Sequence, residues 1–431
     1  MDFITGKQVW QYYQLYKKTQ WYSADEMMDF QIRKLKKLLD HCYRNVPYYT
    51  KVITERQIDI KNFETLDVLL QFPILTKEII QANYDEFTPL NNDKIKGVKI
   101  SQTGGTTGNI LFKRNDSLTR SSIWGSYKRY EDWMGLTKHK KTLILMGGHV
   151  QKSNLKNKFR TIITRFLENS VSVDIYNTSE ETIEKIINLL QTYNFVQIRS
   201  YPQFLFSLAQ NLEKKELSFN VKSISTTAEP VMPEHRHLFK KVFNTDVFDQ
   251  YGCGEIGGIA YECDKHEGLH IAEEHVILEQ NDLQELIITD LDNFTMPFIR
   301  YWNADQAILS NKKCSCGRQS VIIKQIMGRT CDYVTGSNGQ FLHWAYFWHL
   351  IFDSNIAISR NLKKFQIVQN TKENISFKLV ADLLSKEEEE FIISNIQSKL
   401  GEMKIDFTYL SEIENTKSGK YRPVINDLLS I

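Results

Sequence analysis

Net charge, long apolar runs and cysteine are all scarce in this sequence of 431 residues. The 54 basic and 52 acidic residues leave a formal net charge of +2, which gives no electrostatic reason to expect nucleic acid or an anionic membrane as a partner. No run approaches the roughly 18 apolar residues that a membrane span needs. The first residues lack the apolar core and cleavage site of a signal peptide. The sequence therefore predicts a cytoplasmic protein without a membrane span.

The length of the chain predicts two or three domains, because 431 residues are too many for one ordinary hydrophobic core. Apolar residues make up 42% of the sequence and charged residues 25%, as in globular proteins. No internal repeat and no low-complexity segment is visible. Six cysteines in a chain of this size favour free thiols or a metal site over a disulfide framework.

In most of the chain, β-like segments alternate with helical ones, as in α/β proteins. Apolar residues recur at helical spacing over 32–42, and Pro47 should end that helix, since proline disfavours helix in the residue before it. Short β-like runs at 142–146 and 171–176 precede a helical stretch at 179–193. Such alternation predicts a sheet covered by helices.

The C-terminal part follows a different pattern. Two short strands, 365–368 and 375–380, flank a polar turn, as in a hairpin. A helix over 386–400 closed by Gly401 comes next, and a strand at 405–410 follows it. This β-β-α-β order predicts a small α+β domain of roughly 100 residues.

Residues 103–108 have the sequence Thr-Gly-Gly-Thr-Thr-Gly. Glycines let a backbone wrap around a phosphate, and threonine hydroxyls add hydrogen-bond donors without bulk. No Gly-Lys-Ser/Thr follows, so the segment is not a Walker A loop. By itself it fits a phosphate-binding loop and a plain turn about equally well.

Four later motifs favour the phosphate-binding interpretation of that loop over a plain turn. Together with it they resemble, in order and approximate spacing, the motifs of adenylate-forming enzymes. Several moderate motifs in a fixed order are far more specific than any one of them. The four are Tyr251-Gly252-Cys253-Gly254-Glu255, Arg300-Tyr301-Trp302-Asn303-Ala304-Asp305, Gly328-Arg329-Thr330-Cys331-Asp332 and Ser418-Gly419-Lys420.

Within that superfamily the chain is most similar to the phenylacetate–CoA ligase group, and especially to its CapK-like branch of capsular polysaccharide biosynthesis proteins. This resemblance implies a large N-terminal adenylation domain of mixed sheets and helices, residues 1–328, and a small mobile α+β lid domain, residues 329–431. The segments that carry it are 38–49, 73–77, Ser200-Tyr201-Pro202, 296–301 and Cys314-Ser315-Cys316-Gly317-Arg318.

The resemblance implies a site that binds ATP. The loop at 103–108 would hold the β- and γ-phosphates, Tyr251 would lie against the adenine, and Asp305 would accept hydrogen bonds from the ribose. The full set of nucleotide-binding residues that it implies is Thr103, Gly104, Gly105, Thr106, Thr107, Gly108, Ala228, Glu229, Pro230, Tyr251, Gly252, Asp305 and Arg329.

The resemblance also implies two catalytic residues. Glu255 would anchor Mg²⁺ through oxygen, and Lys420 would supply positive charge at the α-phosphate in the transition state. The plain alternatives are an ordinary loop carboxylate for Glu255 and a solvated basic tail for Lys420.

The cysteines favour a structural zinc site. Cys314 and Cys316 form a close thiol pair, and Cys263 precedes two histidines. Three thiolates and one imidazole make a tetrahedral zinc set. The resemblance points to His270 over His266 as the fourth ligand. Unliganded thiols and a redox-active pair remain the alternatives.

The sequence departs from the pattern of the superfamily at three places. Gly254 stands where relatives have Thr or Ser, Ala304 replaces a glycine, and Asn109-Ile110 replaces a common Lys-Pro. None of these changes removes Glu255 or Lys420, so an active enzyme is expected.

The residues support three functions. The first is an AMP-forming ligase that adenylates a small carboxylic acid and passes the acyl group to coenzyme A. The second passes it to an amine or sugar acceptor in polysaccharide or secondary-metabolite biosynthesis. The third is a non-catalytic, zinc-stapled binding scaffold. A homodimer is compatible with each of the three.

Overall fold

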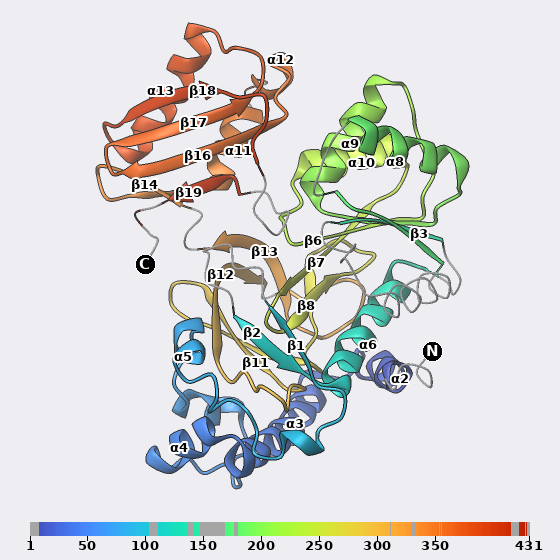
Figure 1. The fold of residues 1–431 in the computed structure, drawn as a ribbon, viewed down its shortest axis with the longest axis vertical. Helices are drawn as coiled ribbons and strands as arrows, with labels where there is room; N and C mark the ends of the chain where they lie inside the picture. The colour runs from blue at the N-terminus through green and yellow to red at the C-terminus, as the bar shows by residue number, and fades with distance from the viewer. Residues whose placement is uncertain are drawn as a thin grey trace. The chain divides into compact units, whose positions relative to one another are not determined.

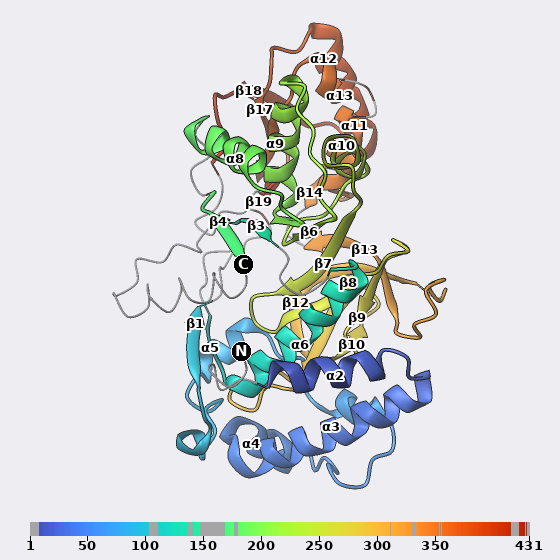
Figure 2. The same ribbon diagram turned by 90° about the vertical axis from the view of Figure 1, so that its right-hand side faces the viewer.

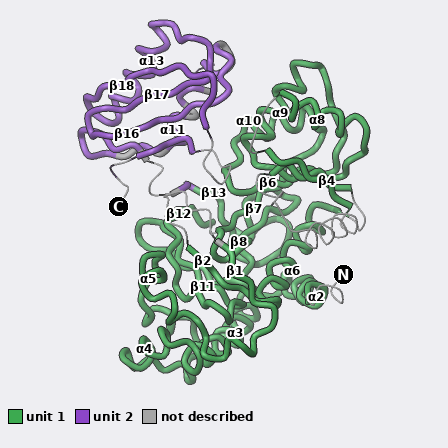
Figure 3. The backbone as a smooth tube through the Cα atoms, viewed as in Figure 1, with its two compact units in different colours: residues 1–326 green, residues 327–431 purple. Residues whose placement is uncertain are grey.

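The computed structural model describes residues 8–102, 111–136, 141–146, 169–175, 180–310, 312–329, 333–352, 354, 356–414, 422–426 and 428. The chain divides into two compact units, residues 1–326 and 327–431, and each is described by itself (Figure 3). The domain boundary predicted from the sequence, between residues 328 and 329, lies two residues after this division. No described helix combines the length and the apolar character that a bilayer crossing requires.

The first unit is built on one large mixed sheet. Its eleven strands follow the order β10-β11-β12-β13-β9-β8-β7-β6-β5-β3-β4. One side of the sheet is parallel and consists of β4, β3, β5, β6 and β7. The pairs β7–β8, β8–β9, β9–β13, β10–β11 and β11–β12 are antiparallel. The bounds are β3 Thr142–Leu145, β4 Ser170–Val173, β5 Gln197–Ser200, β6 Ser223–Thr227, β7 Val247–Cys253, β8 Gly257–Glu262, β9 Leu269–Ile271, β10 Val276–Gln280, β11 Glu285–Asp290, β12 Tyr301–Ser310 and β13 Ile322–Arg329.

Helices cover the parallel strands. α8 (Glu180–Thr192), α9 (Pro202–Lys214) and α10 (Pro233–Phe243) lie together on one face (Figure 1). α6 (Ser117–Trp133) packs against the sheet through Tyr130, whose hydroxyl donates to the carbonyl of Phe248 on β7. This arrangement confirms the α/β prediction, including the strands expected at 142–146 and 171–176 and the helix expected at 179–193.

Four helices lie near the N-terminus (Figure 2). α2 (Val9–Thr19) packs on α6, whereas α3 (Ala24–Asn45), α4 (Pro47–Glu55) and α5 (Lys77–Ala82) share a core with the antiparallel strands. Ser23 and Glu26 form a capping box that starts α3. The helix ends at Asn45, as expected, and Pro47 then begins α4 because proline suits the first turn of a helix. The apolar face of α3 joins a core that continues under β10–β12. Two short 3₁₀ helices, Leu66–Gln71 and Asn92–Lys94, complete this region.

The second unit is a small α+β domain. Its four-stranded sheet has the order β18-β17-β16-β19, and a separate hairpin pairs β14 with β15. The bounds are β14 Tyr333–Thr335, β15 Phe341–His343, α11 Trp344–Phe352, α12 Ile356–Ser359, β16 Lys364–Thr371, β17 Asn374–Val380, α13 Lys386–Leu400, β18 Lys404–Tyr409 and β19 Val424–Asn426. The predicted hairpin, helix and following strand are therefore confirmed. Stacked Phe365 and Phe377 form part of its core.

Candidate functional site

Three polar side chains meet where β7 and β12 face each other. The Tyr251 hydroxyl lies 2.6 Å from the Asp305 carboxylate and donates to it, while the Asn303 amide donates to both, at 2.7 Å to Tyr251 and 2.8 Å to Asp305. All three residues are buried. Burial first, and Asp305 second, raise the pKa of Tyr251 well above its usual value, so the phenol stays protonated and serves as a donor. The structure thus joins Tyr251 and Asp305, two residues that the motifs singled out separately.

The strand β12 carries a β-bulge at this position. On β11 the partners Glu285 and Ile287 are two residues apart, but the residues opposite them, Gln306 and Trp302, are four apart. Asn303 and Asp305 are two residues apart on β12, so their side chains share one face of the strand, the buried one. Ala304 between them has a φ of 62°, in the left-handed region that glycine adopts without strain. The glycine that relatives carry at this position therefore has a conformational reason.

The end of β7 needs a glycine for a different reason. A Cβ atom on Gly252 would lie 2.2 Å from the carbonyl oxygen of Gly257, across the β7–β8 pair. The chain can therefore reverse tightly at this point and present the segment that carries Glu255. Lys113, on β2 (Phe112–Asn115), donates from its ammonium group to the carbonyl oxygen of Glu255 at 3.2 Å.

Lys113 is a residue that the motifs alone did not find. Burial lowers the pKa of its ammonium group, and Cys253 and Glu255 partly oppose that effect. β2 pairs antiparallel with β1 (Lys99–Gln102), and Gln102 lies opposite Phe112. The two strands thus flank residues 103–110 at their neighbouring ends. A lysine placed on the strand after a Gly/Thr-rich loop is a signal that could have identified it.

The Ala228-Glu229-Pro230 segment follows β6. Ala228 adopts a φ of 73°, and an Oε atom of Glu229 accepts from the backbone N–H of Gln203 at 3.1 Å. Gln203 lies in the first turn of α9, where unpaired N–H groups and the helix dipole favour a carboxylate. Glu229 therefore fixes the end of β6 to the start of α9.

Several predicted residues cannot be placed. Thr103, Gly104, Gly105, Thr106, Thr107, Gly108 and Lys420 lie outside the described residues. Arg329 is the last residue of β13, and its side chain is likewise outside the described part.

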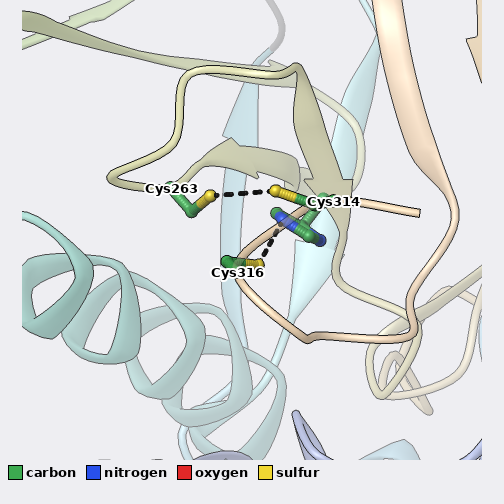
Figure 4. Close-up of side chains that lie close together, drawn as sticks. Cys263, Cys314 and Cys316 are labelled. Carbon is green, nitrogen blue, oxygen red and sulfur yellow. Dashed lines mark hydrogen bonds between the residues drawn. The ribbon is translucent and has the colours of Figure 1, made fainter. Parts of the chain in front are cut away.

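A second cluster combines three thiols and one imidazole. The ligand atoms of Cys263, His270, Cys314 and Cys316 all lie within 4.8 Å of one another. The sulfur atoms of Cys263 and Cys314 are 3.6 Å apart, and the sulfur atom of Cys316 is 3.4 Å from Nε2 of His270 (Figure 4). Tetrahedral bonding at about 2.3 Å to sulfur and about 2.0 Å to nitrogen requires separations of about 3.8 and 3.5 Å. The cluster therefore has the dimensions of a Cys₃His metal site.

The surroundings of His270 hold its ring in place. Nδ1 lies 2.8 Å from the hydroxyl of Ser320, and Trp133 contacts the ring edge-on. Burial, and then Arg318, lower the pKa of His270 to about 4, so the imidazole is neutral at pH 7, the form that binds metals. His266 lies elsewhere: its Nδ1 is 3.2 Å from a Glu262 oxygen and its ring packs on Phe248.

Comparisons with known proteins agree with this architecture. Residues 336–427 match the family model of the CapK C-terminal domain, which is nearly all of the second unit. The phenylacetate-coenzyme A ligase of Thermus thermophilus is 23% identical over 337 residues, which are 72% of this chain and 71% of that protein. The Escherichia coli enzyme of the same name is 24% identical over 305 residues, or 66% of this chain and 67% of that one.

Solved structures show the same fold. A 2-hydroxyisobutyryl-CoA ligase in its postadenylation state aligns with a TM-score of 0.74 at 14% identity, over 94% of this chain and 91% of that chain. An anthranilate CoA ligase in complex with anthranoyl-AMP aligns with a TM-score of 0.52 at 11% identity, over 75% of this chain and 65% of that chain.

Proposed function

We propose that this chain, an adenylate-forming ligase of the phenylacetate–CoA ligase-like branch by its relatives and fold, activates a small carboxylic acid with ATP and then transfers the acyl group to coenzyme A. The carboxylate attacks the α-phosphate, pyrophosphate leaves, and the thiol of coenzyme A displaces AMP from the acyl-adenylate. The observation that carries the proposal is the buried Tyr251–Asn303–Asp305 group, because it joins two of the ordered motifs in one place.

The nucleotide would bind beside this group. Tyr251 offers an aromatic face to adenine, and Asp305, held by Asn303, offers a carboxylate oxygen to the ribose hydroxyls. Asn303 is an addition to the expected set. Arg329 would provide a second ribose contact, and the residues from Ala228 to Pro230 would border the base.

The phosphates need positive charge and a metal ion. Residues Thr103 to Gly108 would cradle the β- and γ-phosphates, and Glu255 would bind Mg²⁺, which prefers oxygen ligands. Lys113 holds the backbone of Glu255 and brings a cation next to that segment. Lys420 would neutralise the charge that develops at the α-phosphate. Residues 329–431 would act as the lid that delivers it, and the CapK C-terminal match supports that assignment.

A structural zinc ion would occupy the Cys₃His cluster. The Cys263–Cys314 and Cys316–His270 separations fit tetrahedral zinc, and the Ser320 hydroxyl orients His270 through the nitrogen that does not face the thiols. Cys263 follows β8, and His270 lies on β9. The ion would therefore fasten the loop at 314–316 to the strands beside β7, and would take no part in the reaction.

A second candidate acceptor of the acyl group is an amine or a sugar. The CapK match of the second unit and the sequence resemblance to capsular polysaccharide proteins favour transfer to an amine or a sugar in cell-surface or secondary metabolism. Adenylation is common to both candidates, so one experiment separates them. The alternative of a binding scaffold without activity would give no adenylation.

The test is pyrophosphate release across a broad panel of carboxylic acids, measured with and without coenzyme A. The proposal predicts release that depends on the acid, and an acyl thioester when coenzyme A is present. Release without a thioester, together with acylation of an added amine or amino sugar, would favour the second candidate. No release with any acid would leave only the scaffold.

A further inference from the structure

Lys113 touches one of the two proposed phosphate-binding segments and adjoins the other. Its ammonium group donates to the carbonyl oxygen of Glu255 at 3.2 Å. It lies on β2, and the residue before it, Phe112, is paired with Gln102, the last residue of β1. Residues 103–108 therefore leave and rejoin this strand pair next to Lys113. A phosphate held between those residues and Glu255 lies close to the ammonium group.

The strand that carries Lys113 is fixed to the body of the first unit. The carbonyl oxygen of Arg114 accepts from the buried amide of Asn293 at 3.1 Å. The carbonyl oxygen of Asn115 accepts from the guanidinium group of Arg120, on α6, at 2.8 Å. The backbone beside Lys113 is thus held by the segment after β11 and by α6, so the ammonium group has a defined place.

The ammonium group has bonding capacity left. It carries three N–H donors, and within the described part of the chain the Glu255 carbonyl is its one acceptor, with no carboxylate in an ion pair. Burial lowers its pKa, and Cys253, Glu255 and Asp290 oppose that effect. An anion bound beside it would favour the charged form further, because an opposite charge raises the pKa of an ammonium group.

The residue before Glu255 offers phosphate nothing but its backbone. Gly254 is exposed, and it stands where relatives have Thr or Ser, so this position has no side-chain hydroxyl to donate. An ammonium group supplies both a donor and a positive charge. Charge-assisted hydrogen bonds to phosphate are stronger than those from a neutral hydroxyl. Lys113 can therefore replace the missing donor.

We propose that Lys113 is a phosphate-binding residue of the ATP site, which contacts the β- or γ-phosphate and supplies the donor that Gly254 lacks. The ammonium group keeps its bond to the Glu255 carbonyl and gives a further N–H to a non-bridging phosphate oxygen. It thereby connects the Glu255 segment to the triphosphate. This inference rests on the proposed nucleotide site and adds a residue from outside the ordered motifs.

The test compares two nucleotides that differ only in their phosphates. Binding of ATP and of AMP is measured by calorimetry with Mg²⁺ present and without any acid or coenzyme A. Lys113→Met should weaken ATP binding by about tenfold or more and leave AMP binding within about twofold, because AMP lacks the β- and γ-phosphates. Lys113→Arg should retain most of the ATP affinity. The control Lys96→Met, exposed on the turn before β1, should bind both nucleotides as the parent does.

A compensating substitution tests the link with Gly254. Gly254→Ser, made in the Lys113→Met variant, should recover about threefold in ATP affinity, since a neutral hydroxyl forms the weaker hydrogen bond. The same substitution in the parent should gain less, because Lys113 already occupies the phosphate oxygen. No recovery, or an equal gain in the parent, would contradict this exchange of roles.

Nucleotide binding needs no acid, so failure of this inference is distinguishable from failure of the proposed function. Unchanged ATP affinity in Lys113→Met, or equal losses for ATP and AMP, would overturn the role of Lys113 even if pyrophosphate release is normal. A parent that binds ATP through Lys113 but releases no pyrophosphate would refute acid activation alone, and a parent that binds no ATP would overturn both. If Lys113→Met does not fold, the same criteria apply to Lys113→Gln, which keeps a donor and removes the charge.

Discussion

At the scale of single residues, the structure explains what the motifs could not. The motifs identified Tyr251 and Asp305 separately, but their hydrogen bond joins residues 54 positions apart in the sequence, which no local pattern shows. Asn303 was given no role of its own within the 300–305 motif, yet it donates to both partners. Lys113 went unnoticed because its contact with Glu255 joins residues 142 positions apart in the sequence.

Ala304→Gly should stabilise the first unit by about 0.5–1 kcal/mol. A left-handed conformation costs an L-residue about 1–2 kcal/mol, and the greater freedom of glycine in the unfolded chain takes back part of that gain. Urea unfolding followed by tryptophan fluorescence measures the change. Ala307→Gly, at a fully buried position of the same strand, should destabilise the protein and serves as the control. Equal losses in both variants would contradict the assigned conformation.

His235 should make stability depend on pH. It is buried on α10, and its Nδ1 accepts from the backbone N–H of Met232 at 3.2 Å. Burial, and then Arg236, lower its pKa to about 3. The unfolded chain takes up the proton near pH 6.5, so this contribution to stability is complete above that value and falls as the pH drops towards 3. The slope is up to about 1.4 kcal/mol per pH unit.

His235→Gln should remove that slope, because glutamine keeps an acceptor and does not titrate. The free energy of unfolding, measured in urea between pH 7 and pH 4.5, should fall less steeply in this variant than in the parent. His237→Gln, at an exposed position of the same helix, should keep the parent's slope. An unchanged slope in the His235 variant would show that other groups cause the acid sensitivity.

At the scale of elements, buried ion pairs fix the N-terminal helices to the sheet. Lys34 on α3 lies 2.6 Å from one Asp292 oxygen, and Ser122 on α6 donates to the other at 2.5 Å. His275 contacts the same oxygen at 3.0 Å. Burial alone would raise the pKa of Asp292, but Lys34 and then His275 bring it well below its usual value. Asp292 is therefore ionised and depends on its partners.

Lys34→Met should cost about 3 kcal/mol, because removing one member of a buried pair leaves the other charge without compensation. Thermal or urea unfolding measures the loss. Lys37→Met, at an exposed position of α3, should change stability by no more than about 0.5 kcal/mol. Similar small effects in both variants would mean that the Lys34–Asp292 pair contributes little.

The Cys₃His cluster also connects separate elements, because its residues come from the end of β8, from β9 and from the loop at 314–316. Purified protein should contain about one zinc per chain. Cys316→Ser should lose the metal and lower the Tm, as should a strong chelator, whereas Cys42→Ala, in the α3 core, should keep it. Zinc content is measured by atomic emission. Full zinc content in Cys316→Ser, or none in the parent, would contradict the assignment.

Local sequence signals predicted individual elements better than their assembly. The period of apolar residues identified the strands at 365–368 and 375–380 and the helix at 386–400, because each is short, regular and bounded by turn residues. Pro47 was read only as a stop, although it also opens α4. The order of the eleven strands was beyond such signals, since the pairing of β13 with β9 joins segments about fifty residues apart in sequence.

At the scale of the whole molecule, the chain combines a sheet that carries the proposed nucleotide site with a small domain that matches the CapK C-terminal model. The two steps of the proposed reaction have different requirements. In the proposed mechanism, adenylation needs Lys420 at the α-phosphate, while thioester formation needs the acyl-adenylate to meet coenzyme A. In the proposed mechanism, loss of Lys420 therefore affects the first step more than the second.

The most direct measurement is the formation of acyl-AMP from ATP labelled at the α-phosphate, in a single turnover without coenzyme A. The account predicts labelled acyl-AMP with at least one acid, a fall of at least about 100-fold in its rate for Lys420→Ala, and little change for Lys417→Ala as the neighbouring control. Coenzyme A added afterwards should convert the adenylate to AMP and a thioester. No acyl-AMP with any acid, or an undiminished rate in Lys420→Ala, would contradict it.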